Sequence, residues 1–297
     1  MRALATILLL LAAPPAMAEA DEARHAERAR QEARVAEAAY RLTTAGARWC
    51  PRIVQQPGWM LDDPRRHDAE ARASDTPFVA AVAPRSPAAR AGIAPGTGIA
   101  AIDGEAVPTL GDGATIRIDA VIAMLNAIDP AAAWTLTDSA GRTHRMDPAP
   151  GCASAFRIET GGAQAAANGQ LVRLRLDLVR SVADDAELAA VAAHELAHNI
   201  LRHRERLGND RSARRVRQTE LEADRLSVWL LADADYDPAA AIGFWNRHKR
   251  PLVRAASHPP RAERIAAIEA EIAAMQAARA DDPAAAPTWA IVPPPLA

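Results

Sequence analysis

The stretch AAHELAH at residues 192–198 constrains the fold of this chain more than any other feature. Its two histidines, His194 and His198, are four residues apart, so on a helix they share one face and can bind one metal ion. Glu195 would lie beside such an ion, where a carboxylate can accept a proton from a bound water. The stretch therefore predicts a metal site on a helix.

The surrounding residues predict a long helix over 185–201, with Asp184 as its N-cap. Alanine and leucine dominate this helix, so it is apolar on every side and belongs in a core. Burying two imidazoles and a carboxylate there costs free energy unless these polar groups have partners, and a metal ion would be such a partner. The alternative is a pair of core histidines that bond to backbone carbonyls.

A second helix, predicted over 212–231, offers a third ligand. Glu220 and Asp224 are four residues apart on this helix and share a face. We assign Glu220 as the ligand, and Asp224 as the acceptor for the outer N–H of a ligating histidine, which fixes the ring's tautomer. A third histidine ten residues after the first, as in metzincins, is not available, because Arg204 occupies that position.

Three blocks of the sequence belong together by their order and spacing. They are His194-Glu195-Leu196-Ala197-His198, Glu220-Leu221-Glu222-Ala223-Asp224, and Ser257-His258-Pro259-Pro260 followed by Arg264. They resemble zinc metallopeptidases of the HtpX, BepA and CAAX-prenyl-protease group, which are gluzincins. The resemblance implies that one Zn²⁺ per chain is held by His194, His198 and Glu220, with Glu195 as general base. It also implies that His258 lies over the metal, where it stabilises an oxyanion or caps the zinc in a latent state. Arg264 is expected to pair with a carboxylate of the site, such as Asp224.

Residues 49–150 follow the N-terminal helix and have their own order of elements. The expected elements are a strand at 77–82, a short helix at 86–93, a strand ending at 102, a helix at 117–128, and a hairpin of 134–138 with 142–146. This series resembles an inserted PDZ domain. The resemblance implies a groove between a strand edge and a helix, which would bind C-terminal peptides as an additional strand, with Gly58-Trp59-Met60-Leu61 as its carboxylate loop. A PDZ fold that serves only as a spacer or a lid is the alternative.

The predicted fold class is α+β. A mainly helical metallopeptidase domain, residues 151–278, is expected to carry a small sheet, because apolar and basic residues alternate over 170–176. Residues 19–48 are expected to form a helix that packs on this domain. Residues 279–297 are rich in proline and alanine and are expected to be disordered.

Residues 1–18 have the pattern of a cleavable secretory signal, with one basic residue, a short apolar run and a small-residue site at 16–18. The run is too short to span a bilayer, so we expect an exported mature chain without a transmembrane segment, periplasmic if the source is Gram-negative. Cys50 and Cys152 are the only cysteines. In an oxidising compartment we expect them to form a disulfide, with two separate buried thiols as the alternative.

These features together predict an exported zinc metalloendopeptidase that acts on unfolded or envelope proteins and uses its PDZ-like domain for recognition or regulation. The formal net charge of −2 favours neither nucleic acid nor an anionic membrane, so the expected partners are polypeptides. One alternative is a chaperone-like peptide-binding protein of envelope quality control whose zinc site is latent. Another is a metal hydrolase that acts on a non-peptide amide.

Overall fold

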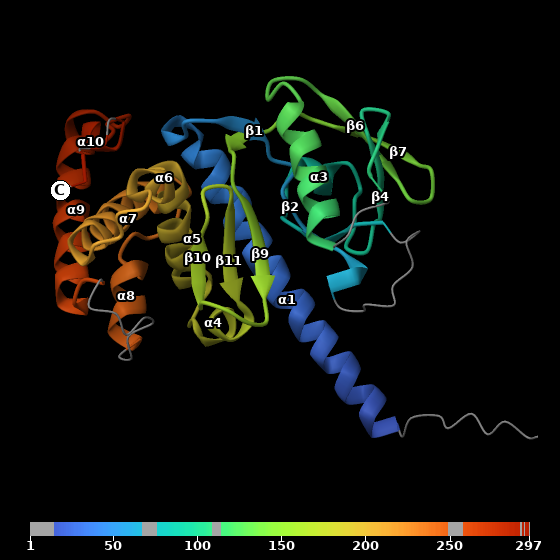
Figure 1. Cartoon of the computed structure of the whole chain (residues 1–297), viewed down its shortest axis with the longest axis horizontal. Coiled ribbons are helices and arrows are strands. Elements are labelled where there is room, and N and C mark those ends of the chain that lie inside the picture. Colours follow the sequence, from blue (N-terminus) through green and yellow to red (C-terminus); the bar gives the residue numbers. More distant parts are fainter. Residues whose placement is uncertain are drawn as a thin grey trace, which may run out of the picture.

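The computed structural model describes residues 15–66, 76–108, 114–248, 258–291, 293, 295 and 296. Most of the predicted signal sequence, residues 1–14, therefore lies outside the described residues. The fold is α+β, as predicted, with a helical part that contains a small sheet and a second part that is rich in strands (Figure 1). In the part of the chain that the structure describes, no helix combines the length and the apolar character needed to cross a membrane.

The elements have the following bounds in chain order. The helices are α1 (Pro15–Ala45), α2 (Pro87–Arg90), α3 (Ala114–Ala127), α4 (Leu176–Ser181), α5 (Asp185–Ile200), α6 (His203–Leu207), α7 (Ala213–Asp233), α8 (Ala240–Arg247), α9 (Arg261–Asp281) and α10 (Thr288–Ile291). The 3-10 helices are η1 (Gly46–Trp49) and η2 (Pro64–Arg66). The strands are β1 (Ile53–Gln55), β2 (Trp59–Asp62), β3 (Phe78–Val82), β4 (Ile99–Ile102), β5 (Glu105–Ala106), β6 (Trp134–Asp138), β7 (Thr143–Met146), β8 (Pro150–Cys152), β9 (Ala155–Glu159), β10 (Ala165–Ala167) and β11 (Leu171–Arg175).

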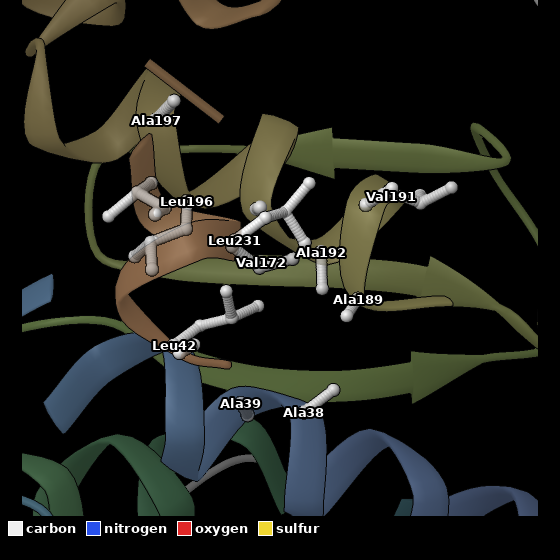
Figure 2. Close-up of a cluster of buried hydrophobic side chains, with 14 of the residues drawn as sticks. Ala38, Ala39, Leu42, Val172, Ala189, Val191, Ala192, Leu196, Ala197 and Leu231 are labelled. Atoms are coloured by element: carbon white, nitrogen blue, oxygen red, sulfur yellow. The ribbon is translucent and has the colours of Figure 1, made fainter. Parts of the chain in front are cut away.

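Helix α5 lies at the centre of the helical part. The side chain of Asp184 accepts a hydrogen bond from the amide of Glu187 at 2.9 Å, so the predicted N-cap is confirmed. Helices α1, α7 and α8 and strands β10 and β11 pack around α5. Figure 2 shows Leu196 of α5 close to Leu42 of α1 and Val172 of β11, and all three are buried. The helix that carries the two histidines is therefore fixed by a close-packed core.

Helix α1 packs along α5, as the sequence predicts for the N-terminal helix. Its residues Val35, Ala39 and Leu42 are buried in the core that α5 shares. The helix ends before Gly46, where an added Cβ would lie 2.7 Å from the Leu230 side chain. Close packing against α7 therefore favours a residue without a side chain at this position.

The small sheet has the strand order β10-β11-β9, with β11 parallel to β9 and antiparallel to β10. Val172 and Leu174 of β11 are buried while Arg173 between them is exposed, as the predicted alternation requires. The Asn168 side chain accepts a hydrogen bond from the Leu171 amide at 2.8 Å and closes the turn before β11. Strand β10 is left at the edge of the sheet, in contact with α5.

The strand-rich part contains a four-stranded antiparallel sheet of order β5-β4-β6-β7 and a separate antiparallel pair of β2 with β3. The predicted hairpin is confirmed, because β6 and β7 pair with Trp134 opposite Met146. Helix α3 covers the core of this part, where its Ile118 belongs to one buried cluster with Leu61 and Leu136. This cluster is separate from the core around α5.

A buried ion pair joins α3 to the end of β2. Arg117 donates from Nε to Oδ2 of Asp63 at 2.7 Å, and neither side chain has exposed surface. Removing one partner of such a pair leaves a buried charge uncompensated, which typically costs about 3–5 kcal/mol. The pair therefore holds α3 at a fixed distance from β2.

The described part of the C-terminal tail differs from the predicted disorder of 279–297. Helix α9 continues to Asp281, and α10 packs on the helical part with Ala290 buried. The Trp289 indole lies against the Arg225 guanidinium at 4.2 Å and donates a hydrogen bond to Glu271 at 3.3 Å. A single tryptophan supplies apolar area and a hydrogen bond that the proline- and alanine-rich composition does not indicate.

Cys50 and Cys152 form a disulfide, which confirms the predicted pairing. Their Cα atoms are 5.4 Å apart at a sequence separation of 102. Strand β1 pairs with β8 in the same place, with Ile53 opposite Cys152. The bond and the two short strands therefore close the neck of the strand-rich part.

Replacing both cysteines by serine should lower the free energy of unfolding by about 2–4 kcal/mol, because the bridge restricts the unfolded chain over a long loop. Urea unfolding followed by circular dichroism measures the change. Dithiothreitol should lower the midpoint of the wild-type protein and leave the midpoint of the double variant unchanged. Free thiols detected in the wild-type protein before reduction would contradict the pairing.

Candidate metal centre

Three side chains from α5 and α7 converge on one point, and they are the predicted ligands. His194 Nε2 lies 3.1 Å from His198 Nε2 and 3.4 Å from Glu220 Oε2, and His198 Nε2 lies 3.6 Å from Glu220 Oε1. Donor atoms of a tetrahedral zinc site, at 2.0–2.2 Å from the ion, are about 3.3–3.6 Å apart. The three side chains therefore come close to the spacing that one such ion requires, and among the described residues they form a group that could hold a metal ion.

The protonation states of two of these ligands suit metal binding. Burial lowers the pKa of His198 well below its ordinary value, so its ring is neutral at pH 7. Burial alone would raise the pKa of Glu220, but hydrogen bonding to His194 and the charges around it hold that pKa below its usual range. The site therefore offers a neutral imidazole and an ionised carboxylate.

His194 behaves differently, because two carboxylates surround it. Burial and the charge of Arg264 oppose its protonation, but hydrogen bonds to Asp224 and Glu220 raise its pKa to about 9. Binding of an ion at His194 therefore releases a proton.

Glu195 is buried next to His194 and lines the same cavity as the three ligands. Burial raises the pKa of its carboxyl to about 7, against the opposing charge of His194. A base is most effective when its pKa lies near the working pH. The position and the environment of Glu195 therefore suit proton transfer at neutral pH.

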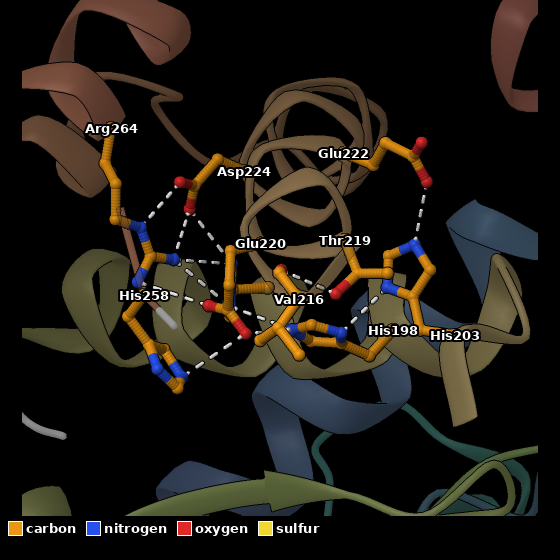
Figure 3. Close-up of polar contacts among 10 residues, drawn as sticks. His198, His203, Val216, Thr219, Glu220, Glu222, Asp224, His258 and Arg264 are labelled. Carbon is orange, nitrogen blue, oxygen red and sulfur yellow. Dashed lines mark hydrogen bonds and ion pairs between the residues drawn. The ribbon is translucent and has the colours of Figure 1, made fainter. Parts of the chain in front are cut away.

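Asp224 and Arg264 lie behind His194, and the structure brings them together as the sequence suggests. Asp224 Oδ1 is 3.0 Å from His194 Nδ1, so the carboxylate can hold the proton there and leave Nε2 free for the ion. Arg264 donates from Nε to Asp224 Oδ2 at 2.6 Å and approaches Glu220 at 3.4 Å (Figure 3). Arg264 therefore bridges the carboxylates of Glu220 and Asp224 on α7.

His258 lies on the open side of the site. Its Nε2 is 3.6 Å from Glu220 Oε1, and 28% of its side chain is exposed. The ring is next to Glu220 in Figure 3, opposite the side where His203 lies. His258 is therefore within reach of a group bound at the three ligands.

A second chain of contacts, which was not predicted from the sequence, runs behind His198. His203 Nδ1 is 2.8 Å from His198 Nδ1, and His203 Nε2 is 3.1 Å from Glu222 Oε2 (Figure 3). Burial lowers the pKa of His203, so its neutral ring can accept from His198 and donate to Glu222. Glu222 is itself held by Arg206 at 2.6 Å. The two histidines are five residues apart in the sequence, and this spacing was the available signal. Because α5 ends between them, helical spacing alone does not predict their contact.

The metal centre opens into a cavity of about 900 Å³, which we call the metal cavity. Residues 163–169, which include strand β10, form one wall, and helices α5, α6, α7, α8 and α9 contribute to the others. A second cavity, of about 730 Å³, lies between β2 and α3 and also touches α1 and β9. Asn168, Gly169, Asn199 and Arg204 line both cavities, so the two are adjacent.

The predicted peptide-binding loop is split between two environments. Gly58, Trp59 and Leu61 line the second cavity. Met60 does not, because alternate residues of β2 face opposite sides and Met60 is only 3% exposed, within the core around α5. Gly58 has a φ of +79°, and a Cβ there would lie 2.2 Å from the Cβ of Ser86, so no other residue fits.

Changing Glu222 to glutamine should weaken zinc binding about 10- to 100-fold, because the carboxylate orients His203 and through it His198. Competition with a chromogenic zinc chelator measures the affinity directly. Glu205→Gln is the matched control, since Glu205 is exposed and pairs with Arg202 on the surface. Equal zinc affinities of the two variants would show that the contact does not orient the ligand.

Comparison with known families supports the chemistry of this site. Residues 160–214 and 207–272 match the model of peptidase family M48. The comparison with curated proteins gives no match. The matched region includes the three ligands, Glu195 and His258, and does not include the strand-rich part. The region that builds the metal centre is thus similar to peptidase family M48, and this supports metallopeptidase activity.

Proposed function

We propose that this chain is an exported zinc-dependent metalloendopeptidase that hydrolyses peptide bonds of unfolded or envelope proteins. The observation that carries the proposal is the triangle of donor atoms from His194, His198 and Glu220, with Glu195 buried beside it. Zinc fits this set because two imidazoles and one carboxylate leave a fourth position open. The match to a peptidase family supports a peptide bond as the target.

The chain's own residues divide the work of such a reaction. A zinc ion, when bound, would supply a Lewis acid that polarises the scissile carbonyl and lowers the pKa of water. Glu195 takes the proton from the attacking water and returns it to the leaving amine. Asp224 and the contact pair His203 with Glu222 keep the two ligating imidazoles in the required tautomers.

Strand β10 suits the binding of an extended polypeptide. Among the described strands it pairs only with β11, and its other edge borders the metal cavity. Its three residues, Ala165–Ala167, are alanines, so no large side chain obstructs that edge. A substrate segment can therefore add to this edge through backbone hydrogen bonds and present a carbonyl to the site.

We also propose that the strand-rich part is a PDZ-like domain that recognises substrate or regulates access. The second cavity supports this role, because it lies between a strand and a helix and adjoins the metal cavity. Export is supported by the signal-like residues 1–18 and by the disulfide, which persists in an oxidising compartment.

Changing Glu195 to glutamine should leave zinc bound and lower the rate of casein cleavage by at least about 10²-fold, because the amide cannot accept the proton. Elemental analysis of the purified variant and release of labelled casein fragments measure the two quantities. Wild-type cleavage by a zinc-loaded variant would exclude Glu195 as the base.

A latent peptide-binding protein remains the second candidate, and the contact of His258 with Glu220 at 3.6 Å favours it. In that case His258 caps the site and holds the enzyme inactive. If His258 instead stabilises the oxyanion, it must be free to approach the scissile carbonyl.

We expect His258→Ala to lower casein cleavage about 10²- to 10³-fold with zinc content unchanged, as loss of an oxyanion donor does. Activity that rises above that of the wild-type protein would instead identify His258 as a cap and support the latent function. His144→Ala is the control, since His144 lies in the strand-rich part and contacts Asp138.

A further inference from the structure

The metal cavity has chemically different ends on the two sides of the ligands. Helix α8 packs against α5 at one end, and α6 follows α5 directly at the other (Figure 1). A substrate that lies along β10 would pass both ends. The composition of each end therefore bears on which substrates are bound.

The end at α8 has an apolar wall, beside which Arg261 donates to the Trp245 carbonyl at 3.2 Å and His248 stacks on Phe244. Val191 precedes His194 by three residues and so lies on the same face of α5, toward the cavity. Ala241, Phe244 and Trp245 of α8 complete this end, with the two aromatic rings 5.3 Å apart in an edge-to-face contact. Ala241, which is buried, has the smallest side chain of this wall. A large apolar side chain next to the scissile bond would bury its surface here.

The end at α6 is positively charged. Arg204 and Arg211 line the cavity there, and both are exposed. Within the described residues neither guanidinium forms an ion pair, whereas Arg264 at the centre is fully engaged with Asp224 and Glu220. The charge at this end is therefore available to a ligand, and it suits a carboxylate.

The distance between the two ends sets how far apart the apolar and acidic side chains must lie in a substrate that contacts both ends. From Val191 to Ile200 at the end of α5 the helix rises about 14 Å, at 1.5 Å per residue. An extended peptide covers that length with about four residues, at 3.3 Å per residue. The ligands lie between these ends, so the scissile bond would as well.

We propose that the metal cavity selects polypeptide segments that carry a large apolar side chain beside the scissile bond and an acidic side chain about three to five residues away on its other side. This inference rests on the proposed peptidase function and names the substrate class of the same site. The chemistry is that of a mixed acidic and apolar segment in extended form.

The first test measures binding without turnover. Zinc-loaded Glu195→Gln protein is mixed with fluorescein-labelled ten-residue peptides that carry one phenylalanine and, four residues away, either two glutamates or two lysines. We expect the acidic peptide to bind roughly fivefold more tightly or better in low salt, and the difference to shrink as salt rises. Equal affinities, or tighter binding of the lysine peptide, would overturn the inference.

A charge reversal identifies the residues responsible. Arg204→Glu combined with Arg211→Glu should reverse the preference toward the lysine peptide. The control combines Arg145→Glu with Arg214→Glu, two exposed arginines outside the metal cavity that change the net charge equally. A reversal in both double variants would assign the effect to net charge and sink the proposal.

The apolar end is tested by filling it. Ala241→Leu should lower kcat/KM for substrates with phenylalanine beside the cut about 10- to 100-fold relative to substrates with alanine there. Ala239→Leu, on the exposed start of the same helix, should leave the ratio unchanged. Zinc content and thermal unfolding establish that each variant folds. If Ala241→Leu does not fold, Phe244→Ala is the second variant. It enlarges this end and should shift the preference toward tryptophan.

Cleavage-site profiling of an unfolded protein digest by mass spectrometry tests the substrate selectivity separately from the peptidase function. Cuts without apolar or acidic enrichment would reject the selectivity and leave the peptidase function standing. Selective binding by the Glu195→Gln protein, with no cut by the zinc-loaded wild-type protein, would reject the peptidase function and leave the selectivity standing.

Discussion

The contact between α5 and α7 is the constraint on which the rest of this structure depends. It brings two imidazoles and a carboxylate within 3.6 Å of one another inside a helical core. Polar groups this deep are costly unless each finds a partner, so the surrounding elements are arranged to supply partners. Helix α9 brings Arg264, α6 brings His203, and the apolar faces of α1 and α8 hold α5 in place.

Each ligating histidine is held from behind by a different route. Asp224 contacts Nδ1 of His194, and His203 contacts Nδ1 of His198, so both Nε2 atoms point to the same place. The two routes use separate residues of α7 and separate arginines, Arg264 and Arg206. The geometry of the site is therefore built by cross-helix hydrogen bonds as much as by the spacing within α5.

The elements that follow from local pattern could be predicted, and those that follow from tertiary contact could not. The i, i+4 spacing and the Asp184 cap determine α5, the hairpin is marked by its turn, and two lone cysteines pair. By contrast, the contact of His203 with His198 crosses the end of a helix, and the packing of Trp289 depends on Glu271 and Arg225. The burial of the Met60 side chain likewise depends on which face of β2 packs against the core around α5.

The buried pair of Arg117 with Asp63 has a consequence for the second cavity. The two residues tie together α3 and the end of β2, two of the elements that line it. A ligand that separated α3 from β2 would leave these buried charges without their partners, which typically costs about 3–5 kcal/mol. The ion pair therefore opposes any binding mode that requires α3 and β2 to move apart, and it favours ligands that the existing cleft accommodates without distortion.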